Sequence, residues 1–271
     1  MSTAVRFESV RYRYPGGIEA LRGVSLAVDT GERVAIVGEN GAGKTTLVRH
    51  LNGIFRPTEG SVYVGETSTH GQTIAQLAAQ VGYVFQNPDE QLFARTVQAH
   101  VEFGPRNLGL TPDEAAARAA SALATVQLTA EAGAHPHHLS LSERKRVALA
   151  GVLAMRTPVV VLDEPTTGQD ARGVEMIAGV VESLTAEGRT IIAITHDMDF
   201  CAEHFDRVIV MAAGEILADG HPREVFAQAD ALARAAIEPP QLFRLAARLG
   251  WRSGPLTPAE FVDAFSAEAT A

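Results

Sequence analysis

The sequence predicts an α/β protein built around a parallel β-sheet, and three observations support this fold class. The stretch "RVAIVGENGAGKTTLVRHL" runs from an apolar strand through a glycine-rich loop into a helix. "VVVLD" and "TIIAI" are short apolar runs without alternation, which is typical of strands buried on both faces of a parallel sheet. A helical segment at 171–187 lies between these two runs, so the three form a β-α-β unit.

The other elements of the first part of the chain follow in order. "AVRFESVRYRY" alternates loosely and predicts a strand, and "VSLAVDTGERVAIVG" predicts two strands around a turn at 30–31. The helix after the glycine-rich loop carries Leu47, Leu51 and Ile54 on one face. Residues 88–155 are rich in Ala, Leu, Arg and Glu, and we expect a mostly helical insertion there.

The last part of the chain begins with "RVIVMAAGEILADG", which predicts a closing hairpin with its turn near 213–214. From Pro222 onward, prolines divide the tail into short helices. These helices carry apolar stripes made of Leu242, Leu245 and Leu249 and of Phe261 and Phe265. We therefore expect one domain at 1–220 and a helical C-terminal extension at 221–271.

Composition limits the function classes. The 271 residues are 46% hydrophobic, enough for a sizeable core. A net charge of −9 argues against a broad nucleic-acid surface, so we expect no nucleic-acid partner. The single cysteine excludes an internal disulfide framework. The N-terminus lacks a secretory signal, and no apolar run approaches the roughly 20 residues that span a bilayer. We expect a protein that reaches a membrane only through partner subunits.

The segment "GENGAGKT" fits the phosphate-binding pattern G-x-x-x-x-G-K-[ST], and its strand and helix flanks make the match specific. Glycines let backbone N–H groups surround a phosphate, and the helix N-terminus adds a positive dipole. Lys44 brings a charge to the β- and γ-phosphate oxygens, and Thr45 offers a hydroxyl to Mg²⁺. The expected ATP-binding residues of this P-loop are Gly38, Glu39, Asn40, Gly41, Ala42, Gly43, Lys44, Thr45 and Thr46.

Two carboxylates end the predicted strand "VVVLD". Ligands bind at the carboxyl ends of strands in open α/β sheets, which is where Asp163 and Glu164 stand. We expect Asp163 to hold Mg²⁺, and Glu164 to accept a proton from the attacking water or to orient it. Losing such a base typically lowers the rate by about 10²- to 10⁴-fold.

These motifs stand in the order found in a known family. The chain resembles the nucleotide-binding subunit of ATP-binding-cassette (ABC) transporters from about Val5 to Gly220. "LSLSE" lies where the family signature L-S-G-G-Q belongs, upstream of the acidic strand. The resemblance implies a P-loop NTPase of the ABC ATPase fold. This fold has a mixed RecA-like sheet, an antiparallel β subdomain and an α-helical signature subdomain, here at about 88–155.

The resemblance also implies roles for single residues. Gln86 in "VFQNP" matches the Q-loop glutamine, and His196 in "ITHD" matches the switch histidine. Asp170 matches the D-loop aspartate, and Tyr14 matches the aromatic residue that stacks on adenine. The implied catalytic residues are Glu164, His196, Gln86 and Lys44. The implied Mg²⁺ ligands are Thr45, Gln86 and Asp163.

Within the signature, Ser140 and Glu143 form the S-x-x-E capping-box pattern that begins a helix. In this family that helix points its N-terminus at the γ-phosphate held by a second subunit, so ATP completes a dimer interface. The residues expected to act in trans are Leu139, Ser140, Leu141, Ser142 and Glu143.

Three signature residues depart from the family pattern, since Leu141 and Ser142 replace two glycines and Glu143 replaces glutamine. Glycine permits close backbone approach, so we predict a slow ATPase. The double change Leu141→Gly with Ser142→Gly should raise its turnover. In the D-loop, Gln169 stands where leucine is usual.

The segment "VGYVFQNPDEQLFARTV" resembles the Q-loop region of energy-coupling factor transporters, which import cobalt, nickel and vitamins. This resemblance implies an ATPase pair, with a homodimer favoured, at the cytoplasmic face of the membrane. The pair would bind a transmembrane scaffold subunit, which works with a membrane substrate-binding subunit. Cobalt or nickel is favoured as cargo, and a vitamin is the second choice.

Two questions stay open. The C-terminal extension is expected to join two subunits, or else to pack on its own domain. The chain as a whole is either the transport ATPase described above, a non-transport ABC ATPase, or a regulatory module that hydrolyses ATP weakly. No long heptad repeat separates the P-loop from the signature, and Glu164 and His196 are both retained, so the transport ATPase is favoured.

Overall fold

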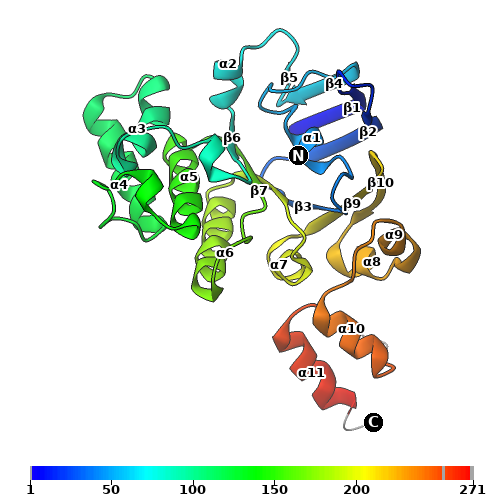
Figure 1. Cartoon of the computed structure of the whole chain (residues 1–271). Coiled ribbons are helices and arrows are strands. Elements are labelled where there is room, and N and C mark those ends of the chain that lie inside the picture. The colour runs from blue at the N-terminus through cyan, green and yellow to red at the C-terminus, as the bar shows by residue number, and fades with distance from the viewer. Residues whose placement is uncertain (1, 252–253, 269–271) are drawn as a thin grey trace.

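The computed structural model describes residues 2–251 and 254–268, and its centre holds two β-sheets that share a hydrophobic core (Figure 1). The smaller sheet is antiparallel, with the strand order β2-β1-β4-β5. Its strands are β1 (Thr3–Arg13), β2 (Glu19–Asp29), β4 (Glu59–Val64) and β5 (Thr67–Ser68).

The larger sheet has the strand order β10-β9-β3-β8-β7-β6. Neighbouring strands are parallel from β9 to β6, and β10 pairs antiparallel with β9. Its strands are β3 (Arg33–Val37), β6 (Val81–Val84), β7 (Val159–Asp163), β8 (Thr190–Ile194), β9 (Arg207–Ala212) and β10 (Glu215–Gly220). The predicted parallel sheet, β-α-β unit and closing hairpin are therefore confirmed.

Helices surround the larger sheet. They are α1 (Lys44–Val48), α2 (Ile74–Ala78), α3 (Val97–Asn107), α4 (Pro112–Thr125), α5 (Leu141–Met155), α6 (Ala171–Ala186), α7 (Met198–His204), α8 (Pro222–Phe226), α9 (Ala229–Arg234), α10 (Gln241–Arg248) and α11 (Pro258–Glu268), with the 3₁₀ turns η1 (Pro88–Glu90) and η2 (Pro136–His138). The helices α3, α4 and α5 lie together (Figure 1), as predicted for the helical insertion. Within the described residues, no helix combines the length and the apolar character needed to cross a membrane.

One predicted element is wrong in its length. The helix after the glycine-rich loop ends at Val48, whereas the predicted apolar face continues to Ile54. The chain leaves the helix through successive turns, with Gly53 at φ +75°, and Ile54 is 40% exposed. The two strands around the turn at 30–31 both form, but they belong to different sheets.

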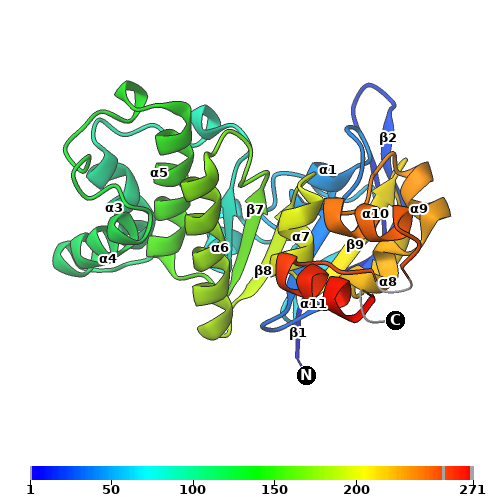
Figure 2. The same cartoon turned by 90° about the horizontal axis from the view of Figure 1, so that it is seen from below.

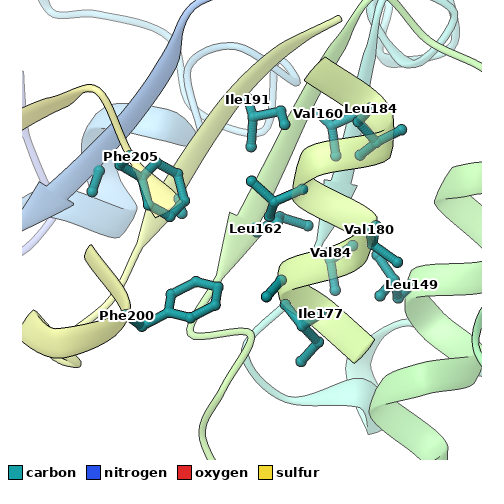
Figure 3. Close-up of a cluster of buried hydrophobic side chains, with 14 of the residues drawn as sticks. Val84, Leu149, Val160, Leu162, Ile177, Val180, Leu184, Ile191, Phe200 and Phe205 are labelled. Carbon is teal, nitrogen blue, oxygen red and sulfur yellow. The ribbon is translucent and has the colours of Figure 1, made fainter. Parts of the chain in front are cut away.

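The helix α6 lies between the larger sheet and α5 (Figure 3). Ile177, Val180 and Leu184 on α6 are buried in one hydrophobic cluster with Leu162 on β7 and Leu149 on α5. Burying a side chain of this size contributes about 1.5–3 kcal/mol. This packing joins the helical insertion to β7, whose carboxyl end leads into the acidic pair.

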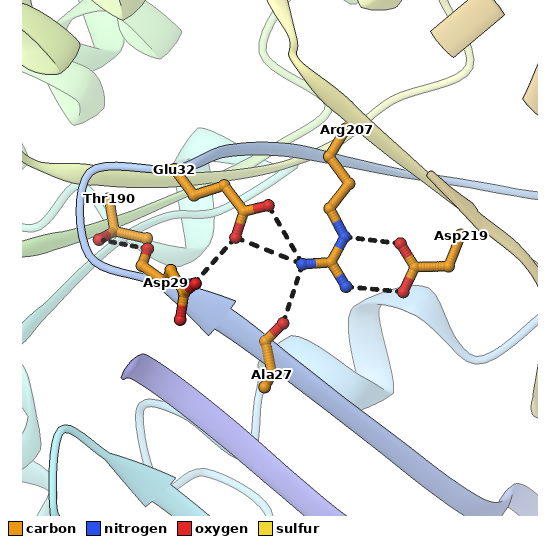
Figure 4. Close-up of polar contacts among 6 residues, drawn as sticks. All are labelled: Ala27, Asp29, Glu32, Thr190, Arg207 and Asp219. Carbon is orange, nitrogen blue, oxygen red and sulfur yellow. Dashed lines mark hydrogen bonds and ion pairs between the residues drawn. The ribbon is translucent and has the colours of Figure 1, made fainter. Parts of the chain in front are cut away.

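Arg207 joins the two sheets (Figure 4). Its guanidinium donates hydrogen bonds to both carboxylate oxygens of Asp219 on β10, at 2.6 and 2.7 Å. The Nη1 atom also donates to the backbone oxygen of Ala27 on β2 at 3.0 Å, and to Glu32 at 3.1 Å. Hydrogen bonds from Arg207 to Asp219 raise the pKa of the guanidinium. A single side chain therefore connects β9, β10, β2 and the turn before β3.

The first helices after β10 pack on the body of the protein. Val225, Phe226 and Leu232 are buried in the same cluster as the sheet. Farther along, the backbone N–H of Gln241 donates to the Oδ1 atom of Asp199 on α7 at 2.9 Å. The helices α10 and α11 lie on the side of the molecule that carries β9, away from α3 to α5 (Figure 2).

These last two helices expose apolar side chains. Leu245 on α10 and Leu249 at its C-terminal cap are 43% and 54% exposed, and Val262 and Phe265 on α11 are 62% and 58% exposed. Other residues of the same region are buried, among them Ala246 and Leu256. The extension thus packs on its own chain while it leaves an apolar surface uncovered.

Candidate nucleotide-binding site

The P-loop turns sharply between β3 and α1, and its glycines have positive φ angles that other residues rarely adopt. Gly38 has φ +154° and Gly43 has φ +100°. A Cβ on Gly38 would collide with the backbone oxygen of Met211, and one on Gly43 would lie 2.6 Å from the oxygen of Ala20. The loop therefore depends on glycine at both positions.

The Lys44 side chain folds back over this loop. Its Nζ atom donates to the backbone oxygens of Gly38 at 2.6 Å and Glu39 at 2.9 Å. Burial lowers the pKa of the Lys44 amine, and the carboxylates of Glu164, Asp163 and Glu39 oppose that shift. The amine thus lies between the loop and the acidic strand end. At this place an oligophosphate chain would compete with the carbonyl oxygens of the loop for the Lys44 amine.

Asp163 ends β7 with a buried carboxylate that has two partners. The Oη atom of Tyr83 donates to Oδ2 at 2.8 Å, and the hydroxyl of Thr45 donates to Oδ1 at 3.4 Å. Burial raises the pKa of Asp163, whereas the hydrogen bonds from Tyr83 and Thr45 lower it. Mg²⁺ prefers oxygen ligands, and the Asp163 carboxylate and the Thr45 hydroxyl place two such oxygens close together. These residues therefore fit the cation.

Glu164 follows with an unusual backbone, since its φ is +54°. Its Oε2 atom lies 2.8 Å from Nδ1 of His196 and accepts a hydrogen bond from the Thr167 hydroxyl at 3.3 Å. The backbone oxygen of Glu164 accepts a hydrogen bond from Nζ of Lys145 on α5 at 3.1 Å. Burial lowers the pKa of the Lys145 amine, and Glu164 and Asp163 oppose the shift.

A cavity of about 410 Å³ opens above the P-loop and the acidic strand end. It is lined by Tyr14, Ile18, Glu19, Ala20, Asn40, Gly41, Ala42, Gly43, Lys44, Thr45, Thr46, Gln86, Asp163, Glu164 and Ile194. The hydroxyls of Tyr14 and Thr46 are hydrogen-bonded at 2.9 Å. Ile18, which is 71% exposed, adds an apolar side chain at the same rim.

A second hollow of about 420 Å³ adjoins the first, and Gln86 and Glu164 line both. His196 and Glu39 line this second hollow too, together with 236–238 from the segment between α9 and α10. The C-terminal extension therefore passes beside the histidine that contacts Glu164.

The signature residues lie elsewhere. Ser140 caps α5, since its hydroxyl accepts from the Glu143 backbone N–H at 3.3 Å and donates to the Glu143 carboxylate at 2.7 Å. The predicted capping box is confirmed, and the bonds from Ser140 lower the pKa of Glu143. Leu141 is 48% exposed. Of the described residues that line the cavity above the P-loop, none comes from 139–143.

The D-loop contacts the signature directly. The Ser142 hydroxyl donates to Oε1 of Gln169 at 2.7 Å, and Nε2 of Gln169 donates to the backbone oxygen of Ser142 at 3.3 Å. Asp170 begins α6 by accepting a hydrogen bond from the Gly173 N–H at 2.8 Å. Ser142 and Gln169, two of the residues that depart from the family pattern, thus bind each other.

Comparison with known proteins identifies the family. The family model described as "ABC transporter" matches residues 21–167, which is more than half of the chain. The chain belongs to this family. The energy-coupling factor transporter ATP-binding protein EcfA of Methanothermobacter thermautotrophicus is 43% identical over 247 residues, covering 90% of this chain and 79% of that protein. The chain is therefore an ABC transporter ATPase of the energy-coupling factor type.

Two solved structures are similar to this ABC ATPase. One is CbiO1 from Clostridium perfringens, part of the ABC transporter complex CbiONQ, with a TM-score of 0.76 and 36% identity over 92% of this chain and all of that one. The other is the ATP-binding cassette MJ0796, a dimer in a post-hydrolysis state bound to ADP and phosphate. It has a TM-score of 0.74 and 28% identity over 80% of this chain and 98% of that one.

Sequence reasoning overlooked several residues at the site of this ABC ATPase. Tyr83 and Lys145 hold the acidic pair, and Ile18 lines the nucleotide cavity. The sequence contains one indication of the role of Lys145, because a lysine on a buried helix face requires a polar partner. The other two contacts depend on segments far apart in the chain.

Proposed function

We propose that the chain powers uptake of a transition metal ion, cobalt or nickel first and a vitamin as the alternative, through a membrane scaffold and a membrane substrate-binding subunit. The observation that carries the mechanism is the separation of the signature from the nucleotide cavity of the same chain. Residues 38–46 surround the phosphates, and residues 139–143 present a capped helix N-terminus elsewhere. A second copy supplies the missing half, so two chains enclose two ATP molecules.

In the proposed reaction, Lys44 leaves the loop carbonyls and binds the β- and γ-phosphates. Tyr14 and Ile18 hold the base at the rim of the cavity. Glu164 takes a proton from water as the water oxygen bonds to the γ-phosphorus and the bond to the bridging β–γ oxygen breaks. His196 holds the Glu164 carboxylate in place, which the 2.8 Å contact supports.

Thr45, Asp163 and Gln86 are the proposed Mg²⁺ ligands. The hydroxyl and carboxylate already approach each other at 3.4 Å, and Gln86 lines the same cavity. When bound, Mg²⁺ neutralises charge on the phosphate oxygens.

The dimer is tested by mixing two inactive variants, Lys44→Ala and Ser140→Ala. A heterodimer of the two contains one composite site with an intact P-loop and an intact signature. We expect the mixture to hydrolyse ATP, while each variant alone does not. If no mixing ratio restores turnover, the composite site and its mechanism are wrong.

The variant Glu164→Gln separates the alternatives. A transport ATPase should lose turnover by about 10²- to 10⁴-fold while ATP binding remains. If the wild-type protein hydrolyses ATP very slowly and the variant has the same rate, the weakly hydrolysing regulatory module is favoured.

A separate experiment identifies the cargo. It measures uptake of labelled cobalt, nickel and biotin in cells that express the chain with its membrane partners.

We propose further that the extension at 221–271 joins the two subunits without ATP. The exposed leucines of α10 and the exposed Val262 and Phe265 of α11 support this role. The paired change Leu245→Ser with Leu249→Ser should reduce the mass in nucleotide-free solution from dimer to monomer. The matched change Ala233→Ser with Ala247→Ser should not. An unchanged mass in the leucine variant would leave the extension packed on its own domain only.

A further inference from the structure

A hollow of about 90 Å³ lies at the edge of the larger sheet opposite the P-loop. The P-loop follows the carboxyl end of β3, whereas Arg189 directly precedes β8, which is parallel to β3. The hollow is bordered by the carboxyl-terminal parts of α4, α5 and α6, which lie side by side (Figures 1 and 2). None of the proposed ATP-binding residues reaches it.

Three guanidinium groups from three parts of the chain meet around this hollow. Arg118 comes from α4, Arg156 ends α5, and Arg189 lies between α6 and β8. Of the described residues that line it, Glu187 is the one carboxylate, and its Oε2 atom lies 3.0 Å from Nη2 of Arg189. The lining of the hollow thus carries more positive than negative charge, although Arg118 also lies near Glu114 of α4, which is outside the hollow.

Arg189 lies at the base of the hollow, with its side chain only 11% exposed. Its Nη1 atom is buried and has no hydrogen-bond partner among the described residues. Burial lowers the pKa of Arg189; Glu187 opposes this shift, and the nearby charges of Arg156 and Arg118 add to it. A buried donor without a partner, beside like charges, is unfavourable unless an anion is bound.

We propose that this hollow binds a small oxyanion of the phosphate class, held by Arg118, Arg156 and Arg189. Guanidinium groups match the geometry of phosphate oxygens, and the hydroxyls of Ser121 and Ser183 line the same hollow. At about 90 Å³ it holds one tetrahedral anion, whereas the nucleotide cavity measures about 410 Å³. The anion would join α4 and α5 of the helical insertion to the sheet through Arg189.

The test is a titration with inorganic phosphate at constant ionic strength, followed on the Nε–H resonance of Arg189. We expect a saturable shift in the wild-type protein. Arg118→Gln and Arg156→Gln should each weaken binding at least fivefold. Glu187→Gln should tighten binding, because it removes the carboxylate that competes with the anion.

Two controls isolate this site. Arg234→Gln changes an exposed arginine on α9 and should not alter the affinity. Lys44→Ala weakens phosphate binding at the P-loop and should also leave the Arg189 titration unchanged. A linear, non-saturating shift, or equal affinities in the wild type, Arg118→Gln and Arg156→Gln, would overturn the proposal.

A free phosphate ion and the phosphate headgroup of a lipid present the same oxyanion, and a vesicle experiment distinguishes them. The wild-type protein is sedimented with vesicles of phosphatidic acid and phosphatidylcholine. Co-sedimentation that is lost in Arg118→Gln but kept in Arg234→Gln would identify a lipid headgroup as the ligand. Phosphate binding without sedimentation would identify the free anion.

Discussion

At the scale of single residues, Glu164 combines a strained backbone with a fixed side chain. A residue other than glycine at φ +54° costs about 1–3 kcal/mol and persists only where its surroundings hold it. Here the N–H of Glu164 donates to the Ile194 oxygen at 2.8 Å, and Lys145 binds the Glu164 oxygen at 3.1 Å. The orientation of the carboxylate therefore depends on a lysine that lies outside the nucleotide cavity.

Replacing that lysine should slow catalysis and leave nucleotide binding intact. A hydrogen bond from a charged donor contributes about 1.5–3 kcal/mol, so we expect Lys145→Met to lower kcat about tenfold. The KM for ATP should not change, because Lys145 does not line the cavity. Steady-state ATPase kinetics measure both values. Arg144→Gln, which changes the neighbouring residue, is the control, and an unchanged kcat in Lys145→Met would refute the positioning role.

His100 on α3 gives the protein an acid-sensitive stability. The ring is buried, its Nδ1 atom lacks a hydrogen bond among the described residues, and burial lowers the pKa of His100 to about 4. The unfolded chain binds the proton near the ordinary pKa of about 6.5, so protonation favours unfolding as pH falls from about 6.5 toward 4. Between pH 7 and pH 5, this one group should remove about 2 kcal/mol of stability.

Denaturant unfolding of wild type and His100→Leu at both pH values measures this contribution. The difference in the free energy of unfolding between pH 7 and pH 5 should shrink in the variant. His70→Gln, which changes an exposed histidine, should keep the wild-type difference. An equal difference in all three proteins would show that His100 is not the acid-sensitive group.

At the scale of elements, the start of α5 and the loop before α6 behave as one unit. Ser142 and Gln169 exchange two hydrogen bonds, and each replaces the residue usual in the family. Replacing Ser142 by glycine leaves Oε1 of Gln169 without its donor, while the backbone oxygen that accepts from Nε2 is kept. The gain in turnover predicted for Leu141→Gly with Ser142→Gly should therefore be larger when Gln169→Leu is added.

A double-mutant cycle tests this coupling. Ser142→Gly and Gln169→Leu should each lower ATP turnover, and the double variant should recover most of the loss. The expected coupling energy is about 1 kcal/mol, typical of two residues in direct contact. Additive effects of the two changes would mean that the hydrogen bonds have no influence on turnover.

Elements with strong local signals could be predicted from the sequence, and contacts between distant segments could not. The P-loop, the capping box and the hairpin each depend on a few neighbouring residues, and the structure contains all three. The end of α1 depends on how the chain turns at Gly53, which helical periodicity does not reveal. The partners Tyr83 for Asp163 and Lys145 for Glu164 come together only through sheet order and helix packing.

At the scale of the whole molecule, Arg207 adds a polar connection between two sheets that also share a hydrophobic core. Arg207 binds two carboxylates and one strand carbonyl, with its side chain 24% exposed. Removing it takes one donor from each of these acceptors, although Glu32 still accepts from the Asp29 N–H. We therefore expect Arg207→Met to lower the free energy of unfolding by about 2 kcal/mol. Denaturant titration measures the change.

A matched control is available for this prediction. Arg33 is 23% exposed and makes two hydrogen bonds, both to Asp206, which is 62% exposed. An exposed pair contributes about 0–1 kcal/mol, so Arg33→Met should cost less than Arg207→Met. Equal losses would mean that the bond to β2 adds nothing to stability.

The uncovered leucines of α10 have a consequence for kinetics. Two chains tethered there would remain at an effective concentration in the millimolar range after each cycle of opening. Re-closure on ATP would then be a first-order event, and the rate per subunit would not change on dilution.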